Sequence, residues 1–344
     1  MNARVAAILL VLLAVLGGGA LLYQQQERAR RPENVGTLGR TLFKDLKAAD
    51  IAAIKIVEPS SSPNATLTLQ RKDERWVIAE RGDFPADLSR VREFVLKVIG
   101  LKVGQSEPLG EKDRARLNLD ASGTRAEFNG ADGKPLGSFV VGKKYFKRDV
   151  ENPDKAMPDG RFVGLPGEAG TAFLVSDPLT QATVKTAEWI DRSSFQVEKV
   201  KTLQVRYPGG EGWRIERLAD NAEWKLAGAK PGEKLDISRA NAASYSLQLL
   251  ELADVAPKDA KEDTKTSGLD KPIAVDATTL EGASYAIKVG KLAGDNYYVS
   301  FASSGSKKPN EKLLSEHVLL IPKSKLEDTL KKRSELLEKK DQRK

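Results

Sequence analysis

The sequence contains no cysteine, and this absence excludes several kinds of chemistry at once. Without a thiol the chain forms no disulfide, carries no thiolate nucleophile and binds no metal through sulfur. It also has no attachment point for a lipoprotein anchor. The absence does not decide the compartment, because an extracytoplasmic protein need not contain disulfides.

Histidine is nearly absent as well, since His317 is the only one in the chain. A Ser-His-Asp triad or a histidine-based metal site would have to use this residue. It begins an apolar run, and no H-E-x-x-H motif lies near it. We therefore expect a structural role at the end of a strand. We predict no catalytic residue, no cofactor and no metal site, in a protein that is not an enzyme.

Two segments resemble ligand-binding motifs without meeting their requirements. The letters "GSFVVGKK" (137–144) match G-x-x-x-x-G-K, but the intervening residues suit a strand interior, and Lys144 stands where a P-loop needs Ser or Thr. The stretch "RDVENPDKAMPDGR" (148–161) is rich in acidic residues, yet it lacks the D-x-[DN]-x-[DN]-G spacing of a calcium loop. We interpret the first as a strand with a turn and the second as a solvated loop.

The excess of positive charge lies at the two ends of the chain. The net charge is +8. Residues 1–31 contribute +3 (four Arg against one Glu), and residues 323–344 contribute +4 (nine Lys/Arg against five Asp/Glu), which leaves +1 for the rest. A nucleic-acid-binding domain concentrates basic charge on its folded surface. We therefore predict no nucleic-acid partner.

An uncharged apolar segment lies close to the N-terminus. Val5–Tyr23 holds 19 residues without a charge, about 28 Å as a helix against a hydrocarbon core of about 30 Å. We expect a single-pass anchor in the cytoplasmic (inner) membrane that contacts lipid through residues 5–23, with the body on the periplasmic or extracytoplasmic side. A cleaved signal peptide is the alternative, because Gly18 and Ala20 fit a small-x-small cleavage site. Residues 24–40 form a polar spacer.

The body of the chain contains an internal repeat. Trp76 recurs as Trp224, "DLSR" (87–90) as "DISR" (236–239), "LD" (119–120) as "LD" (269–270), and "VGK" (141–143) as "VGK" (289–291). The four offsets lie between 148 and 150 residues, which indicates a tandem duplication rather than a solenoid. We expect each tryptophan to anchor its own core and each Asp-x-Ser-Arg segment to begin a helix.

Each copy has the same order of predicted elements. Short alternating runs predict strands, as in "AAIKIV" (52–57) and "TLQVRY" (202–207), and an amphipathic helix follows them in each copy. Strands outnumber helices and mostly follow one another directly, so we predict an α+β fold. It comprises two tandem duplicated domains with mainly antiparallel sheets and packed helices, after one N-terminal transmembrane helix. The domains are residues 41–195 and 196–344, with terminal helices near 178–190 and 323–340, the latter basic.

Three segments together resemble a known family. "TLFKDLKAADIAAIKIVEP" (41–59), "WVIAERGDFPADLSRVREFV" (76–95) and "LGSFVVGKK" (136–144) are similar to bacterial proteins that carry domain of unknown function 4340. The resemblance is clearest over residues 40–190 and continues through the repeat to about residue 330. It implies a membrane-anchored envelope protein of the kind often encoded beside a gliding-associated ABC-type transporter. It supplies no catalytic residues.

One surface segment is a candidate partner contact. "KKYFKR" interleaves cations with two aromatic rings, a pattern that suits anionic lipid headgroups, an acidic partner or a solvated edge hairpin; its residues are Lys143, Lys144, Tyr145, Phe146, Lys147 and Arg148. We expect a non-catalytic, membrane-anchored accessory or scaffold subunit of an integral membrane complex, such as an ABC-type transporter. The alternative is an envelope glycan- or peptide-binding module that uses the groove between the domains.

Overall fold

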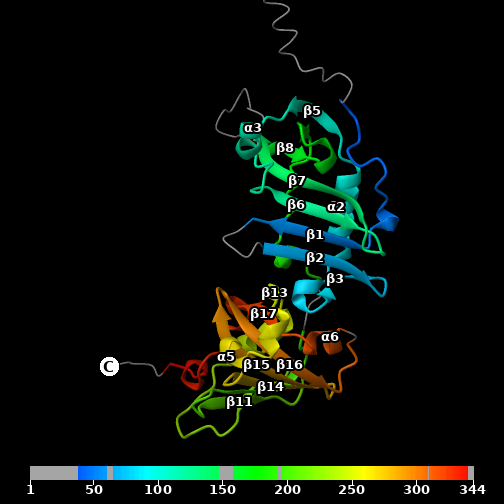
Figure 1. Cartoon of the computed structure of the whole chain (residues 1–344). Helices are drawn as coiled ribbons and strands as arrows, with labels where there is room; N and C mark the ends of the chain where they lie inside the picture. Colours follow the sequence, from blue (N-terminus) through cyan, green and yellow to red (C-terminus); the bar gives the residue numbers. More distant parts are fainter. Residues whose placement is uncertain (1–37, 60–64, 147–157, 193–195, 309, 340–344) are drawn as a thin grey trace, which may run out of the picture. The chain divides into compact units, whose positions relative to one another are not determined.

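The computed structural model describes residues 38–59, 65–146, 158–192, 196–308 and 310–339 (Figure 1). The expected anchor at residues 1–23 and most of the polar spacer lie outside the described residues. Within the described ranges, no helix is long and apolar enough to cross a membrane. The described chain divides into two compact units: residues 38–66 with 92–184, and residues 67–91 with 185–339.

Two antiparallel sheets and a few short helices make up the fold, so the α+β prediction is confirmed. The first sheet has nine strands, in the order β4 (Phe84–Pro85), β3 (Arg75–Ile78), β2 (Ala65–Lys72), β1 (Ala53–Glu58), β6 (Thr124–Asn129), β7 (Pro135–Phe146), β8 (Pro158–Gly164), β9 (Thr171–Val175) and β5 (Val103–Pro108).

The second sheet has eight strands, in the order β12 (Lys225–Leu226), β11 (Gly212–Glu216), β10 (Val200–Arg206), β14 (Ile273–Thr279), β15 (Ser284–Ala293), β16 (Asn296–Ser304), β17 (Leu319–Pro322) and β13 (Asp254–Val255). When β4 is set aside, the strand orders of the two sheets correspond position by position. Three of the four edge strands are short: β4, β12 and β13 have two residues each, which limits unwanted pairing with other chains, whereas β5 has six.

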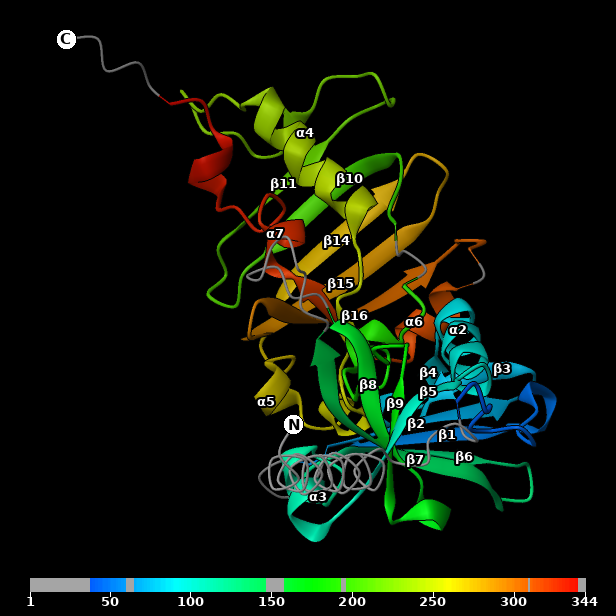
Figure 2. The ribbon, with the colours of Figure 1, turned by 90° about the horizontal axis from the view of Figure 1, so that it is seen from above.

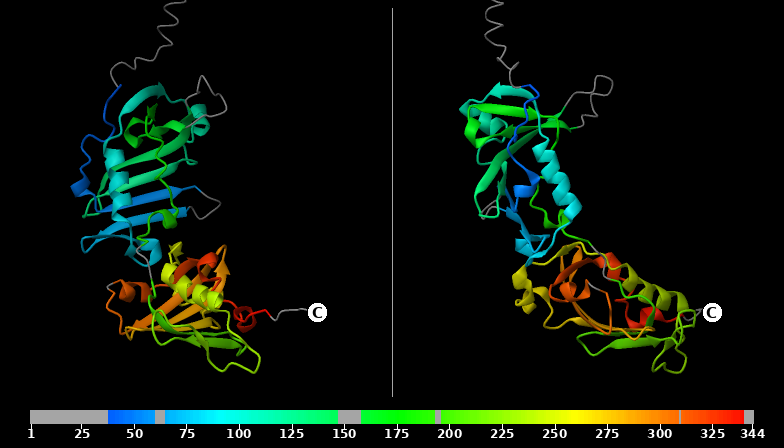
Figure 3. Two further views of the ribbon diagram at one scale, coloured as in Figure 1. Left: turned by 180° about the vertical axis from the view of Figure 1, so that it is seen from behind. Right: turned by 90° about the vertical axis from the view of Figure 1, so that its right-hand side faces the viewer.

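The longer helices each cover one face of a sheet. The helix α2 (Leu88–Ile99) lies across strands of the first sheet (Figure 3), and its apolar stripe of Val91, Phe94, Val95 and Val98 is buried. The helix α4 (Ile237–Tyr245) lies across β10 and β14 (Figure 2). The other α-helices of the described residues are α3 (Glu111–Arg116), α5 (Thr264–Ser267), α6 (Glu311–Ser315) and α7 (Lys323–Leu326). The 3₁₀ turns are η2 (Ala48–Asp50), η3 (Ala79–Arg81), η4 (Pro166–Glu168), η5 (Thr186–Glu188), η6 (Ser246–Leu249), η7 (Lys258–Lys261) and η8 (Arg333–Leu336).

The repeated Asp-x-Ser-Arg segment begins each long helix and also binds a distant stretch of chain. Asp236 Oδ1 accepts a 3.2 Å hydrogen bond from the backbone N–H of Arg239, as a helix cap does. The guanidinium of Arg239 then donates to the carbonyl oxygens of Glu335 and Leu337. In the first copy, Arg90 Nε donates to the carbonyl of Glu188 at 3.1 Å. The repeated motif is therefore framework.

The predicted long terminal helices are wrong. Near 178–190 the chain forms only the turn η5, and residues 323–339, the described part of the predicted basic helix, form α7 and η8 instead. Backbone carbonyls of the C-terminal segment accept hydrogen bonds from other parts of the second unit: Leu330 O from Tyr207 (2.6 Å) and Lys331 O from Trp213 Nε1 (2.7 Å). These bonds take up acceptors that a continuous helix would use itself.

The two repeated tryptophans differ in burial. Trp224 is 3% exposed, and its Nε1 donates a 3.0 Å hydrogen bond to Oδ1 of Asn241, so it anchors its core as expected. Trp76 is only half-buried and lines a shallow cavity with Phe84 and Leu88. The expectation of an equivalent core role therefore holds for the second copy only.

Candidate binding site on the outer face of the second sheet

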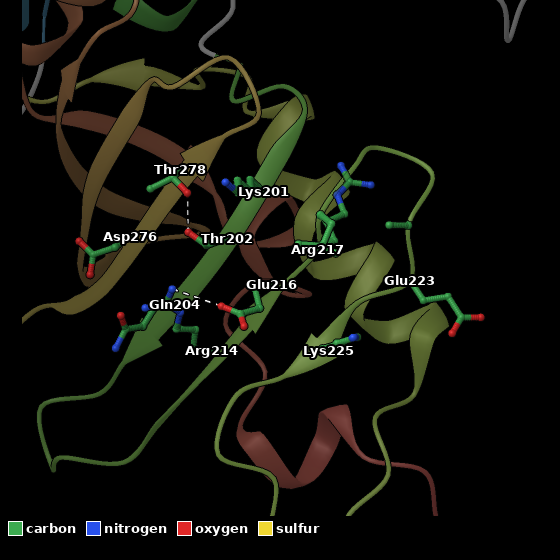
Figure 4. A pocket seen from close by; sticks show the side chains of 12 residues that line it. Lys201, Thr202, Gln204, Arg214, Glu216, Arg217, Glu223, Lys225, Asp276 and Thr278 are labelled. Atoms are coloured by element: carbon green, nitrogen blue, oxygen red, sulfur yellow. Dashed lines mark hydrogen bonds and ion pairs between the residues drawn. The ribbon is translucent and has the colours of Figure 1, made fainter.

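A cavity of about 700 Å³ lies on the face of the second sheet that points away from its apolar core (Figure 4). We call it the outer-face cavity. Its floor is formed by β10, β11, β12 and β14, and its wall by residues 217–223. The lining residues are Lys201, Thr202, Gln204, Arg214, Glu216, Arg217, Leu218, Ala222, Glu223, Lys225, Asp276 and Thr278.

Strand alternation explains why this floor is polar. Along β10, Leu203 and Val205 are buried in the core, whereas Thr202 and Gln204 between them point outward. The strand register then aligns the outward side chains in rows: Thr202 lies between Glu216 and Thr278, and Gln204 lies between Arg214 and Asp276. Any half-buried sheet whose strands alternate apolar and polar residues has a polar outer face, so the floor needs no special sequence.

Part of the charge on the cavity floor is compensated by contacts between neighbouring side chains. The hydroxyls of Thr202 and Thr278 are 2.6 Å apart, and Arg214 Nη2 donates to Glu216 Oε2 at 3.3 Å. Arg206, beside the cavity, brings Nη2 to 2.6 Å from Oδ2 of Asp276, although that oxygen has no well-aligned hydrogen bond among the described residues. The carboxylates of Glu216 and Asp276 are thus paired with arginines.

Arg217 holds the wall of the cavity in place. Its Nε donates to the carbonyl of Val200 at 2.7 Å, its Nη2 donates to Asp220 Oδ1 at 2.6 Å, and its Nη1 donates to the carbonyl of Asp220. The guanidinium also lies over the ring of Trp224, 4.7 Å from the centroid. With its side chain only 9% exposed, Arg217 ties the 217–223 loop to the sheet, so the wall is preformed.

Two lysine ammonium groups at the cavity form no ion pair with the described residues. Lys201 and Lys225 are exposed and form no ion pair within the described part of the chain, and neither does Glu223. In Figure 4 the side chain of Glu223 points away from the rest of the lining. The lining carries four cationic against three anionic side chains. Because Glu216 and Asp276 are already paired, the lysines leave a site that favours a polar ligand with negative charge.

A second, shallower depression of about 490 Å³ shares Arg217 with the outer-face cavity. It is lined by Arg217, Asp220, Asn241, Ala242, Ser244, Tyr245 and Gln248. The ring of Tyr245 is 57% exposed there, next to amide and carboxylate side chains. An open aromatic face beside hydrogen-bonding groups suits a polar ligand with apolar patches, such as a sugar.

Both ring nitrogens of the only histidine, His317, lie near backbone carbonyl oxygens. Nδ1 lies 2.9 Å from the carbonyl of Leu313, and Nε2 lies 3.1 Å from the carbonyl of Gly82. The ring also packs edge-on against Phe84, with centroids 5.2 Å apart. His317 therefore has a packing role within the second unit. Among the described residues, no cluster of three or more His, Cys, Asp or Glu side chains forms that would hold a metal ion.

The predicted partner-contact segment is only partly described. Lys143, Lys144, Tyr145 and Phe146 form the exposed end of β7, whereas Lys147 and Arg148 lie outside the described residues. β7 is an inner strand of its sheet, flanked by β6 and β8, and not an edge strand. The segment is nevertheless the end of a hairpin, because residues 144–146 pair with β8 alone.

The P-loop-like segment 137–144 is strand throughout, as part of β7, without the expected turn, and only the end of the acidic segment 148–161 lies in the described residues. Gly142 lies inside β7, where a Cβ would come 2.4 Å from the carbonyl oxygen of Leu117, so this glycine serves close packing and not phosphate binding. Of the acidic residues in 148–161, Asp149, Glu151 and Asp154 lie outside the described residues. Asp159 belongs to β8, so the end of the expected loop is a strand.

The outer-face cavity is not predicted by the sequence. Its residues alternate with core residues along strands that were predicted, but nothing in that alternation separates a cavity floor from an ordinary solvated face. The wall depends on the stacking of Arg217 over Trp224, a tertiary contact that the spacing of residues in the sequence does not predict.

Comparison with known proteins identifies a family without a described activity. A family model described as Domain of unknown function (DUF4340) matches residues 76–272, more than half of the chain. The chain belongs to this family. Neither a curated protein nor a solved structure matches the chain.

Proposed function

We propose that this protein is a non-catalytic, membrane-anchored envelope subunit that binds a segment of an integral membrane partner in the outer-face cavity. One observation carries the proposal: the cavity has a preformed wall and two unpaired lysine ammonium groups on an open polar sheet face. The uncharged Val5–Tyr23 segment supports the anchoring, and the family resemblance supports a transporter such as an ABC-type exporter as the partner.

The chemistry of the cavity favours an acidic, extended segment of the partner. Lys201 and Lys225 are flexible point charges that bind carboxylates without fixed geometry. The hydroxyls and the Gln204 amide on the floor offer hydrogen bonds to a backbone or to polar side chains. Since the charges sit at an open rim, they mainly guide association and select the sign of the partner's charge.

Photo-crosslinking in cells tests this proposal. A photoreactive amino acid replaces Leu218, which lines the cavity and is 83% exposed, in the otherwise complete chain. We expect a crosslink to an integral membrane protein through an acidic segment. The double variant Lys201→Glu, Lys225→Glu should lower its yield at least about fivefold, because exposed ion pairs contribute about 0.2–1 kcal/mol each and both are reversed here.

A matched variant separates local from general charge effects. Lys271→Glu with Lys307→Glu makes the same change in net charge at exposed positions outside the cavity and should leave the yield unchanged. A photoreactive group at Leu292, 46% exposed, is the second control. An equal yield from position 292, or a yield indifferent to Lys201 and Lys225, would refute binding in the cavity.

The second candidate is an envelope glycan-binding module, which the Tyr245 depression favours. Here the purified full-length protein should bind isolated wall polymer. Tyr245→Ala should reduce that binding severalfold, while the lysine variants should not. Retention of polymer by Tyr245→Ala at the wild-type level would argue against this candidate.

A further inference from the structure

The end of β7 projects beyond its neighbour on one side. Val141 is the last residue of β7 with a partner on β6, namely Thr124. Beyond it, Lys144 pairs with Arg161, Tyr145 with Gly160 and Phe146 with Pro158, so the chain continues as a two-stranded ribbon. We call residues 143–146 and 158–160 the β7–β8 tip.

The tip presents unpaired cations beside exposed aromatic rings. Tyr145 is 39% and Phe146 48% exposed. Lys143 and Lys144 are exposed too, and neither forms an ion pair within the described ranges. Asp159, on the opposite strand of the tip, is the one acidic side chain among its described residues. The ring of Tyr145 packs edge-on against Phe162, at 6.3 Å between centroids, which holds its orientation.

This combination matches the chemistry of a membrane surface. Aromatic rings gather at the headgroup level of bilayers, where one part of the side chain is apolar and another is polar. Lysines near a surface that contains anionic lipid are attracted to it, at a gain of about fivefold in binding for each charge. An ordinary solvated hairpin has no need of two adjacent exposed rings.

The register places the tip near the point where the described chain begins. Lys144 pairs with Arg161, Arg161 with Val175, and Val175 with Val103, whose carbonyl accepts a 2.8 Å hydrogen bond from Gly39 N. Each of these four steps covers about 5 Å, so Lys144 lies within about 20 Å of Gly39. All of these residues belong to the first unit.

The spacer is long enough for the tip to reach the bilayer. The expected anchor ends at Tyr23, and residues 24–37 precede the first described residue. Fully extended, these 14 residues span at most about 50 Å. A tether of this length keeps the first unit close to the membrane, so a second weak contact adds to the anchor at high effective concentration.

We infer that the β7–β8 tip rests on the lipid surface of the membrane that holds the N-terminal anchor, with Lys143 and Lys144 on anionic headgroups and Tyr145 and Phe146 at the headgroup level. This inference depends on the anchoring in the proposed function. Its consequence is an oriented first unit: the tether sets the distance of the unit from the bilayer, and the tip sets which face it turns toward the lipid.

Site-specific fluorescence tests the inference, and the absence of native cysteine makes labelling selective. The full-length chain with Asp159→Cys carries an environment-sensitive dye and is inserted into nanodiscs that contain either phosphatidylcholine alone or a mixture with phosphatidylglycerol. A headgroup spin label reports contact by quenching. We expect quenching and a blue shift in the anionic discs, both reversed by high salt.

Variants then separate the two parts of the contact. Lys143→Gln and Lys144→Gln should each lower the ratio of quenched to unquenched dye about fivefold. Tyr145→Ser with Phe146→Ser should abolish the blue shift. Lys44→Gln with Lys55→Gln removes two exposed lysines of the same unit outside the tip and should change nothing. The dye at Leu292→Cys, in the second unit, serves as the label control.

The outcomes distinguish this inference from the proposed function. If the full chain fails to float with lipid vesicles, the anchor is wrong, and both proposals fall. If it floats but the dye at position 159 stays unquenched, or is quenched equally without anionic lipid and with both lysines replaced, only the tip inference is overturned. An acidic partner protein would then be the next ligand for these lysines.

Discussion

Arg333 binds the carboxylate of Glu233 through two hydrogen bonds across 100 positions of sequence. Nη2 of Arg333 lies 2.6 Å from Oε2, and Nε lies 3.3 Å from Oε1. The backbone N–H of Lys230 donates to the same Oε2 at 2.8 Å. Because all of these bonds favour the ionised carboxylate, with the one from Arg333 the strongest, the pKa of Glu233 falls from 4.5 to about 2.

This pair predicts a loss of stability in acid. The folded pKa of Glu233 is depressed, so its contribution is fully present above pH 4.5 and is lost as the pH falls toward about 2. In Glu233→Gln the contribution is missing at every pH. We therefore expect the wild type to be more stable than the variant at pH 6 and the difference to vanish near pH 2, as measured by urea unfolding at a series of pH values.

A second ion pair in the same region provides the control. Lys234 and Glu338 are 2.9 Å apart, but their side chains are 77% and 46% exposed, so Glu338→Gln should have little effect at any pH. A pH-independent gap between wild type and Glu233→Gln would show that the side chain acts by shape and not by charge.

The strands follow from alternation, because a residue that faces the core must recur at every second position of a strand, and the main helices follow from apolar residues that recur every three or four positions. Leu203 and Val205 in β10, or Ile54 and Ile56 in β1, show the alternation directly. The stripe of α2 and the cap at Asp236 are equally local. These features are decided by neighbours within a few residues, and sequence patterns report such neighbours.

The parts that could not be predicted depend on distant contacts. Residues 323–340 have a helical pattern, but the Tyr207 hydroxyl and the Trp213 indole bind their backbone carbonyls from more than 100 positions away. The strand β8 begins at Pro158 in a stretch rich in Asp and Pro, and only its register with β7 and β9 makes it a strand. The outer-face cavity likewise depends on a tertiary contact, that of Arg217 with Trp224.

The glycines of the repeated "VGK" segments should not tolerate a methyl group. A Cβ at Gly290 would lie 2.1 Å from the carbonyl oxygen of Ser267, and one at Gly142 would lie 2.4 Å from that of Leu117. Since the obstacle is backbone, Gly290→Ala and Gly142→Ala should each destabilise by about 1–3 kcal/mol in chemical unfolding. Gly209→Ala is the control, because nothing lies within 4 Å of its added Cβ and the lower entropy of the unfolded chain should, if anything, stabilise it; a similar loss there would show that the close backbone contacts are not the cause.

The phenol of Tyr207 predicts a loss of stability in alkali. Its hydroxyl donates to the carbonyl of Leu330 at 2.6 Å, and burial raises its pKa from 10 to about 12. A raised folded pKa means that the stabilising contribution is present below pH 10 and is lost as the pH rises through 12. Absorbance at 295 nm should therefore show a tyrosine step near pH 12 that Tyr207→Phe removes and that Tyr285→Phe leaves in place, since burial raises the pKa of Tyr285 as well. A titration complete by pH 11 in the wild type would contradict this.

Glu311 is a carboxylate that the fold buries at some cost. The residue is 5% exposed at the start of α6; Oε1 accepts a 2.9 Å hydrogen bond from the hydroxyl of Tyr285, and Oε2 has no hydrogen-bond partner among the described residues. An ionised oxygen without a partner in a buried position costs more than a neutral amide, which keeps the bond from Tyr285 through its own oxygen. Glu311→Gln should therefore raise the free energy of unfolding, by about 1 kcal/mol at neutral pH. Glu316→Gln, an exposed change in the next turn of chain, should leave it within about 0.5 kcal/mol. If Glu311→Gln instead destabilises the protein by more than about 1 kcal/mol, Oε2 has a donor in solution, and the buried charge is compensated.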